Sequence, residues 1–356
     1  MGNFTWGGAE IKHKKPVVEQ VPSAARVQEI VNGMSSRRVL VAGDLMLDEF
    51  IWGKVSRISP EAPVPVVAVD RETFYPGGAA NVARNLREFT PHAAVLGLAG
   101  RDSAGQRLRD LLTAGGIDTA GVVERGSGPT TVKTRIIART QQVVRVDREL
   151  NESPGTAERR ALLAALDAAL PDVDAVILED YGKGLLDRDL ADEIAAKARA
   201  AGKPVAVDPN PNNPIPWHGV TVIKPNRHEA FAAAGIPWSE PSAHPLEDKQ
   251  LLKAGEILLE KWETDQLLIT LSELGMLLFT KDGLRHHTPT RAREVFDVSG
   301  AGDTAIALYT LALCAGATPV EASEIANHAS GVVVGKLGTA TLTPAELLAS
   351  FQNHAG

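Results

Sequence analysis

Short, continuous apolar segments recur along the chain and constrain its fold more than any other feature. They cover residues 38–44, 93–100, 174–180, 203–208, 220–226 and 266–272. Helical segments lie between most of them, at residues 79–89, 103–114, 156–169, 187–201, 226–234 and 246–262. Apolar strands that alternate with helices are typical of a parallel sheet covered on both faces. We therefore predict an α/β fold with a mostly parallel sheet.

Two stretches interrupt this alternation, at about residues 49–75 and 120–148. They contain strand-like segments without intervening helices, including FIWGKV, VPVVAV, TVKTRIIART and QVVRVD. Several of these segments alternate in polarity, as strands with one polar face do. The two stretches predict a small antiparallel sheet that projects from the main domain.

Length and composition limit the classes of protein to consider. At 356 residues the chain is long enough for one large domain or two. The net charge is −7, from 37 basic and 44 acidic residues, and the basic residues are scattered, so nucleic acid is not an expected partner. Cys314 is the single cysteine, which excludes an internal disulfide and fits a reducing compartment.

The first 36 residues differ in character from the rest. They are polar and mixed and lack the apolar core of a signal peptide, and no apolar run in the chain approaches the ~18 residues of a membrane span. We expect residues 1–36 to be a leader outside the core, with part of a helix at residues 27–31, and residues 37–352 to form the folded domain. We expect a soluble, cytoplasmic protein without a membrane partner.

The octapeptide DVSGAGDT, residues 297–304, directly precedes an apolar helical run that Gly316 ends. A glycine turn at the start of this helix leaves amides unpaired beside the positive end of the helix dipole, which forms a site for an anion. Asp303 would lie beside that anion, where a general base for a hydroxyl attacking phosphorus belongs. The alternative is an ordinary turn in which Asp303 is the helix N-cap.

This octapeptide resembles that of the ribokinase family of carbohydrate kinases, which usually has Thr where this chain has Ser299. The resemblance implies a ribokinase-like fold with a small β-sheet lid over the sugar, ATP as co-substrate and Mg²⁺ as cofactor. It implies that Asp303 deprotonates a sugar hydroxyl and that the amides of Gly300, Ala301 and Gly302 hold the transferring phosphoryl group. The lid often serves as a dimer clasp in this family, so a homodimer through the lid is expected.

Two further segments match the sugar-binding side of the family. GDLMLD places Asp44 and Asp48 at the end of a strand, where ligands of open α/β sheets bind. For Asp44 a strand-terminating turn is an equal alternative. PGGAANVARN places Gly77 and Gly78 before a helix that carries Asn81, so the backbone can pass close to a sugar and Asn81 can donate to and accept from its hydroxyls. The alternative is a strand-to-helix turn.

KPNRHEA places Asn226 and Glu229 three residues apart at a helix start, hence on one face. Magnesium keeps several waters, so an amide and a carboxylate can hold it through water. This segment matches the Asn-x-x-Glu motif with which the family organises magnesium. The alternative is a capping box, in which Asn226 caps the helix and Glu229 folds back.

Other residues are assigned by the resemblance alone. On the nucleotide side these are Lys224, Ser272, Gly275, Gly302 and Asn327, with Ser272 standing where many members carry Gly. Asp297 and Ser299, together with the loop at residues 335–341, would hold K⁺ as in many members.

The substrate is narrowed by residues 53–67, 134–147 and 178–184, which resemble the subgroup that phosphorylates heptose 7-phosphate at O1. The last of these segments contains Asp180, a further candidate for the sugar. Asn210 replaces the Lys usual in that subgroup. Bifunctional relatives carry a C-terminal nucleotidyltransferase domain, which we do not expect within these 356 residues. The alternatives are a kinase for another sugar or sugar phosphate and a non-catalytic sugar-sensing module, which the presence of Asp303 argues against.

A phosphorylated substrate is also indicated by residues 131–139, TVKTRIIAR. In a strand, side chains alternate between faces, which puts Lys133, Arg135 and Arg139 on one face. We predict that Lys133 and Arg135 bind the distal phosphate of the sugar. The alternative is an exposed edge that cations keep soluble.

Overall fold

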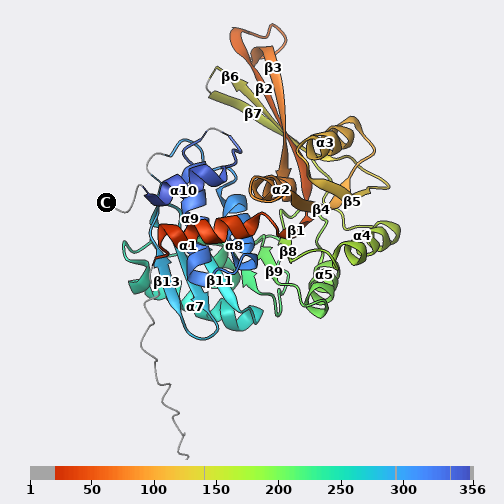
Figure 1. The fold of residues 1–356 in the computed structure, drawn as a ribbon. Coiled ribbons are helices and arrows are strands. Elements are labelled where there is room, and N and C mark those ends of the chain that lie inside the picture. Colours follow the sequence, from red (N-terminus) through yellow and green to blue (C-terminus); the bar gives the residue numbers. More distant parts are fainter. Residues whose placement is uncertain (1–20, 140, 293–294, 337, 353–356) are drawn as a thin grey trace, which may run out of the picture.

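A nine-stranded sheet forms the centre of the computed structural model, which describes residues 21–352 except residues 140, 293–294 and 337 (Figure 1). The strands lie in the order β13-β12-β11-β10-β9-β8-β1-β4-β5. Their bounds are β1 Arg38–Gly43, β4 His92–Ala99, β5 Asp118–Glu124, β8 Ala175–Glu179, β9 Val205–Asp208, β10 Val222–Ile223, β11 Gln266–Thr270, β12 Met276–Thr280 and β13 Arg285–Thr288. Neighbours run parallel except that β12 is antiparallel to β11 and to β13. The predicted α/β fold is confirmed.

Helices cover both faces of this sheet, because successive strand residues point to opposite sides. In β1, Val39 and Val41 belong to one hydrophobic core, whereas Leu40 and Ala42 belong to the other. The first core is covered by α1 (Ala24–Met34), α2 (Ala79–Arg87), α3 (Ser103–Ala114), α8 (Ala301–Cys314), α9 (Pro319–Val333) and α10 (Pro344–Gln352). The second is covered by α4 (Thr156–Ala169), α5 (Arg188–Ala200), α6 (Arg227–Ala234) and α7 (Lys249–Trp262). Two short 3₁₀ turns, η1 (Pro245–Glu247) and η2 (Ser272–Leu274), complete these elements.

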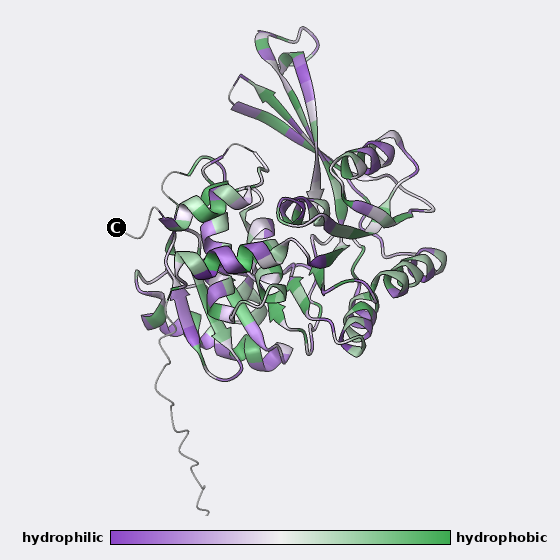
Figure 2. Cartoon of the chain, viewed as in Figure 1, coloured by the Kyte–Doolittle hydropathy of each residue, from purple (hydrophilic) through white to green (hydrophobic). Residues whose placement is uncertain are grey.

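A second sheet of four strands extends away from the body (Figure 1). It contains β2 (Leu45–Ile58), β3 (Pro65–Gly78), β6 (Thr131–Ala138) and β7 (Gln141–Arg148), in the order β3-β2-β6-β7, and we call it the lid. Its strands mix hydrophilic and hydrophobic residues along their length (Figure 2). The expectation of a purely antiparallel sheet is wrong, because β2 and β6 come from separate stretches and pair in parallel. β5, which begins the second predicted stretch, belongs to the main sheet instead.

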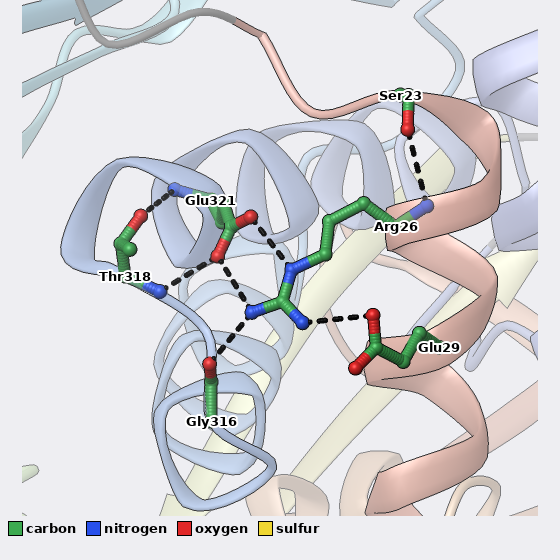
Figure 3. A network of polar contacts seen from close by, with 6 residues as sticks. All are labelled: Ser23, Arg26, Glu29, Gly316, Thr318 and Glu321. Atoms are coloured by element: carbon green, nitrogen blue, oxygen red, sulfur yellow. Dashed lines mark hydrogen bonds and ion pairs between the residues drawn. The ribbon is translucent and has the colours of Figure 1, made fainter.

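The expectation that residues 1–36 lie outside the core is wrong for α1. This helix packs against α8 and α10, and its side chains Val27, Ile30 and Met34 are completely buried. Full burial of each such side chain stabilises the fold by about 1.5–3 kcal/mol. Arg26 also fixes α1 to α9, since its Nε lies 2.8 Å from Glu321 Oε1 (Figure 3). Residues 1–20 lie outside the described part of the chain.

Within the described ranges, none of the helices has the length and hydropathy needed to cross a membrane.

Candidate active site

Asp303 lies in the first turn of α8, where this helix meets α2. Asn81 Nδ2 on α2 donates to Asp303 Oδ2 at 2.6 Å. Asn85 lies one turn after Asn81 on α2, and it accepts at its Oδ1 from Oγ1 of Thr304, the residue after Asp303, at 2.8 Å. The two polar contacts hold the helices together in an otherwise apolar interface and fix the position of the Asp303 carboxylate.

The carboxylate of Asp303 does not cap its helix. The N-cap of α8 is Gly300, at φ 82°, and no side chain caps the helix there. Asp303 instead accepts from Asn81 and from Tyr181 Oη, the latter at 2.7 Å. Burial raises the pKa of Asp303 to about 6, although the hydrogen bonds from Asn81 and Tyr181 lower it. The N-cap alternative is therefore excluded, and the carboxylate is ionised at neutral pH.

The glycine turn before Asp303 lies against Lys224. A Cβ on Gly302 would come within 3.3 Å of Lys224 Nζ, and one on Gly300 within 3.0 Å of Asn81 Nδ2. The predicted turn thus brings two glycines next to polar side chains that a substituent would displace. Three amides were predicted to hold the phosphoryl group, those of Gly300, Ala301 and Gly302. Of these, the amide of Ala301 donates to Val298 O at 3.3 Å.

Two acids that we did not predict lie beside Asp303. Glu179 ends β8 and Asp208 ends β9, and one carboxylate oxygen from each lies within 4.8 Å of the other and of one from Asp303. Lys224 Nζ lies 2.8 Å from Asp208 Oδ2. Glu179 is 2% exposed, and its Oε2 has no hydrogen-bond partner among the described residues. Burial and the charges of Asp208 and Asp303 raise the pKa of Glu179.

This acid cluster fits a magnesium ion, because carboxylate oxygens are its usual protein ligands and Glu179 has an oxygen to spare. Both acids end strands of a parallel sheet, where ligands bind. Their position at the ends of the apolar segments at residues 174–180 and 203–208 was the signal that could have identified them. Asn226 and Glu229, the residues predicted to organise magnesium, hydrogen-bond to each other's backbone instead. Asn226 Oδ1 accepts from Glu229 N at 2.9 Å, and Glu229 Oε2 accepts from Asn226 N at 2.8 Å. The capping box that was the alternative reading is present.

The base of the lid carries the predicted sugar-side residues. Asp48 is 5% exposed, and its Oδ1 lies 2.5 Å from Arg135 Nη1. Gly77 of β3 pairs with Met46 of β2, close to Asp48. A Cβ on Gly77 would overlap the Asp48 carboxylate. Gly78 has φ 59°, and a Cβ there would overlap Asp44 O. The two glycines are thus required by the close packing of β3 on β2.

Lys133 and Arg135 share one face of β6, as predicted. Lys133 Nζ lies 5.2 Å from the centre of the Tyr181 ring, and the Arg135 guanidinium lies 5.1 Å from that of Phe50. Burial lowers the pKa of Lys133, and the nearby positive charges of Lys183 and Arg135 lower it further. β6 ends at Ala138, and Arg139 follows it with φ 58°, so the predicted strand does not extend to Arg139. The placement of Arg139 on this face stays a prediction.

Asp44 and Asp180 hold the loop that carries Tyr181. Asp44 accepts from three backbone amides, those of Tyr181 at 3.0 Å, Lys183 at 2.9 Å and Leu185 at 3.0 Å. Asp180 Oδ1 accepts from Gly182 N at 2.8 Å, and burial raises the pKa of Asp180 to about 7. Both oxygens of Asp44 are engaged by this loop.

A cavity of about 350 Å³ lies on the other side of the glycine turn. Four of the five residues predicted for the nucleotide line it, namely Ser272, Gly275, Gly302 and Asn327. Lys224, the fifth, lies against Gly302. Ser272 has φ 53°, a left-handed conformation that favours the glycine found in many relatives. The remaining lining is mostly apolar, with Met276, Val295 and Val334 among it.

The carboxylate of Asp297 accepts hydrogen bonds from two backbone amides. Its Oδ1 accepts from Ser299 N at 2.9 Å and its Oδ2 from Gly338 N at 3.1 Å. Burial raises the pKa of Asp297, but hydrogen bonds from Ser299 and Gly338 outweigh it, so the pKa is lowered overall. The predicted K⁺ site at Asp297 and Ser299 stays a prediction.

A family model of the pfkB family carbohydrate kinases matches residues 36–346. The chain belongs to the pfkB family. It is thus a carbohydrate kinase, and the predicted family and enzyme class are confirmed.

Curated relatives of this pfkB-family chain include the Bifunctional protein HldE of Geobacter sulfurreducens, which is 44% identical over 319 residues. That of Gluconacetobacter diazotrophicus is 44% identical over 317 residues. Each match covers 89% of this chain, and the chain spans 64% of the length of either relative.

Two solved structures share the fold of this pfkB-family chain. Ribokinase of Arabidopsis thaliana, complexed with ribose and ATP, has a TM-score of 0.67 at 18% identity, over 89% of this chain and 99% of that one. Phosphofructokinase-2 of Escherichia coli, in complex with potassium, has a TM-score of 0.71 at 18% identity over the same shares. The predicted ribokinase-like fold is confirmed.

Proposed function

We propose that this carbohydrate kinase transfers the γ-phosphoryl group of ATP to O1 of D-glycero-β-D-manno-heptose 7-phosphate, as in the synthesis of ADP-heptose for lipopolysaccharide. The observation that carries the proposal is the position of Asp303. It is buried between Asn81, at the base of the lid, and the glycine turn beside Lys224. The resemblance of residues 53–67, 134–147 and 178–184 to the heptose 7-phosphate subgroup, and the match to HldE proteins, support the choice of sugar.

Asp303 removes the proton from the attacking hydroxyl. Asn81 and Tyr181 donate to its two oxygens and hold the carboxylate in place, and the pKa of about 6 keeps it ionised at neutral pH yet able to accept a proton. The hydroxyl itself lies against Asp48 and Asn81, whose polar atoms fix its direction. Asp44 and Asp180 act as positioning residues, because they hold the loop that carries Tyr181.

The transferring phosphoryl group lies at the turn of Gly300 and Gly302, where Lys224 supplies positive charge. Glu179 and Asp208 would hold Mg²⁺ beside it, with Glu229 and Asn226 reaching the ion through water. When bound, Mg²⁺ neutralises charge on the phosphates. ATP occupies the cavity of Ser272, Gly275 and Asn327.

The distal phosphate of the sugar lies against the cations at the base of the lid. Lys133, Arg135 and Lys183 interact electrostatically there. Among the described residues, Asp48 pairs with Arg135, and Glu149 pairs with Lys183 at 2.7 Å. Two carboxylates thus face three cations, and an anion beside Lys133 relieves the remaining repulsion. Arg135 can bind it bidentately while it leaves Asp48 to the sugar hydroxyls.

A homodimer through the lid is part of this proposal. The outer strand β7 is exposed along its whole length, and Val144 and Val146 are 45% and 52% exposed on one face of it. A partner would cover these apolar side chains and the open edge of the sheet. Sedimentation of the purified chain at several concentrations tests this point, and a monomer at all of them would contradict it.

The function is tested by measuring ATP consumption against a panel of free and phosphorylated sugars. We expect heptose 7-phosphate to give the highest kcat/KM. Equal values for heptose and heptose 7-phosphate would exclude the distal phosphate site, and a higher value for another sugar would make that sugar the substrate. Sugar binding without ATP turnover would instead support a sensing module.

A further inference from the structure

The segment that follows β13 forms one wall of the nucleotide cavity. Thr290 and Ala292 line the cavity, and the chain between them carries Arg291. This wall is fastened to α9, since Asn327 Nδ2 donates to Pro289 O at 2.7 Å. The position of the wall, and with it the width of the cavity, therefore depends on α9.

Glu324 on α9 faces this wall from the inside of the protein. Its side chain is 1% exposed, and its Oε1 lies 3.1 Å from His286 Nε2. Its Oε2 lies 3.8 Å from Arg291 Nη2. A buried carboxylate is costly unless it is paired and hydrogen-bonded, so Glu324 needs both neighbours.

The contact between Glu324 and Arg291 is incomplete. A separation of 3.8 Å is too long for a hydrogen bond. Glu324 Oε2 and Arg291 Nε are both buried and have no hydrogen-bond partner among the described residues. A shift of Arg291 by about 1 Å towards α9 would make a charge-assisted hydrogen bond of normal length. Because Thr290 and Ala292 flank Arg291, that shift would also move the wall.

We infer that Glu324 is a positioning residue for nucleotide binding. It holds the cavity wall through Arg291 and His286, and its contact with Arg291 shortens when a nucleotide fills the cavity. The inference rests on the proposed function, which places ATP in this cavity. The competing reading is that Glu324 only stabilises α9 and β13.

Glu321 provides a matched control. It lies on the same helix, one turn before Glu324, and also forms an ion pair with an arginine (Figure 3). Its partner is Arg26 on α1, and neither Glu321 nor Arg26 lines the cavity. Replacing each glutamate by glutamine removes one charge from the same helix, but the ion pair that is lost has a different partner in each case.

The experiment compares Glu324→Gln and Glu321→Gln by steady-state kinetics with MgATP and sugar, and by thermal unfolding. We expect Glu324→Gln to raise the KM for ATP about tenfold, with kcat and the sugar KM changed less than about twofold. Glu321→Gln should lower the melting temperature and leave the KM for ATP unchanged. Arg291→Ala should raise the KM for ATP as Glu324→Gln does, and the double variant should be no worse than either single one.

An unchanged KM for ATP in Glu324→Gln overturns the inference, as do additive effects of the two single variants. If Glu324→Gln does not fold, Arg291→Ala decides, because Arg291 is partly exposed, and a normal KM for ATP in that variant again overturns it. Failure of the proposed function is recognised separately, since wild-type protein would then show no saturable dependence on ATP.

Discussion

The two sides of Asp303 are built from different kinds of residue. On the lid side, charged and amide side chains contact one another, as Asp48 does with Arg135 and as Asn81 does with Arg84. On the cavity side, small residues and backbone form the wall, with Gly275 and Gly302 among them. Under the proposed function, the lid side would recognise the sugar by charge, and the cavity side would recognise the nucleotide by shape.

This difference has a consequence for substitutions. A truncated side chain at the base of the lid leaves a buried charge without its partner, which is costly. A larger side chain in the cavity narrows the cavity and clashes with backbone atoms. We expect the first kind of change to alter which sugar is accepted, and the second to alter nucleotide affinity alone. The four predictions below test this division.

The largest effect is expected at Asp303, which both sides share. Asp303→Asn removes the base but keeps the size of the side chain, so turnover should fall by ~10²–10⁴, the range of a general base. Nucleotide binding, measured by titration, and thermal stability should stay close to wild type. Near-normal turnover in a folded variant would remove Asp303 from the mechanism.

On the lid side, Arg135→Ala should weaken phosphosugar binding by ~1.5–3 kcal/mol, the scale of a charge-assisted hydrogen bond. The KM for ATP should not change. The matched control is Arg71→Ala, which removes another lid cation, one that lies over Trp52. If both variants lose the same affinity for the phosphosugar, or if Arg135→Ala loses as much affinity for unphosphorylated heptose, Arg135 does not bind the phosphate.

On the cavity side, Gly275→Ala should raise the KM for ATP several-fold with no change in the KM for the sugar. Gly275 has φ 89°, and a Cβ there would overlap Thr288 O. Gly283→Ala is the control, because Gly283 has φ 92° with nothing within 4 Å of the added Cβ. Gly283→Ala should lose stability by about 1–2 kcal/mol because of its positive φ. Gly275→Ala should lose more, because its added Cβ also overlaps backbone atoms. A change in the KM for ATP in both would mean that general destabilisation is the cause.

The smallest effect on stability is expected at Glu229. Glutamine also serves in a capping box, so Glu229→Gln should change the free energy of unfolding by less than about 0.5 kcal/mol. The magnesium concentration needed for half-maximal rate should rise, but less than in Asp208→Asn, because Asp208 belongs to the acid cluster. A lower melting temperature with unchanged magnesium dependence would limit Glu229 to its capping role.

Local patterns predicted the elements well. The predicted and observed bounds coincide for α3 and α4, and the glycine turn before α8 lies where the octapeptide placed it. Part of α1 was predicted, at residues 27–31, but it was placed outside the core, because polar surroundings suggested a leader. The helical spacing of Val27, Ile30, Val31 and Met34 was the signal for its buried face.

Contacts between distant segments could not be predicted in this way. The carboxylate of Asp44 holds amides some 140 residues further along, at a distance that no local pattern encodes. The parallel pairing of β2 with β6 is of the same kind. The spacing of Asn226 and Glu229 by itself favoured a capping box, and the metal site was predicted because of the other motifs. The structure shows the hydrogen bonds of the capping box.

The attachment of α1 to α9 has a consequence for synthesis of the chain. Arg26 and Glu321 are 295 residues apart, so at 5–20 residues per second the ribosome needs roughly 15–60 s to produce the second after the first. During this time Val27, Ile30 and Met34 lack the surface that buries them, and α1 presents an apolar stripe to the cytosol or to a chaperone. Of the helices in the described residues, α1 leaves the ribosome first, yet it is among the last to reach its native place. A nascent chain arrested before residue 321 should therefore expose residues 24–34 to proteases.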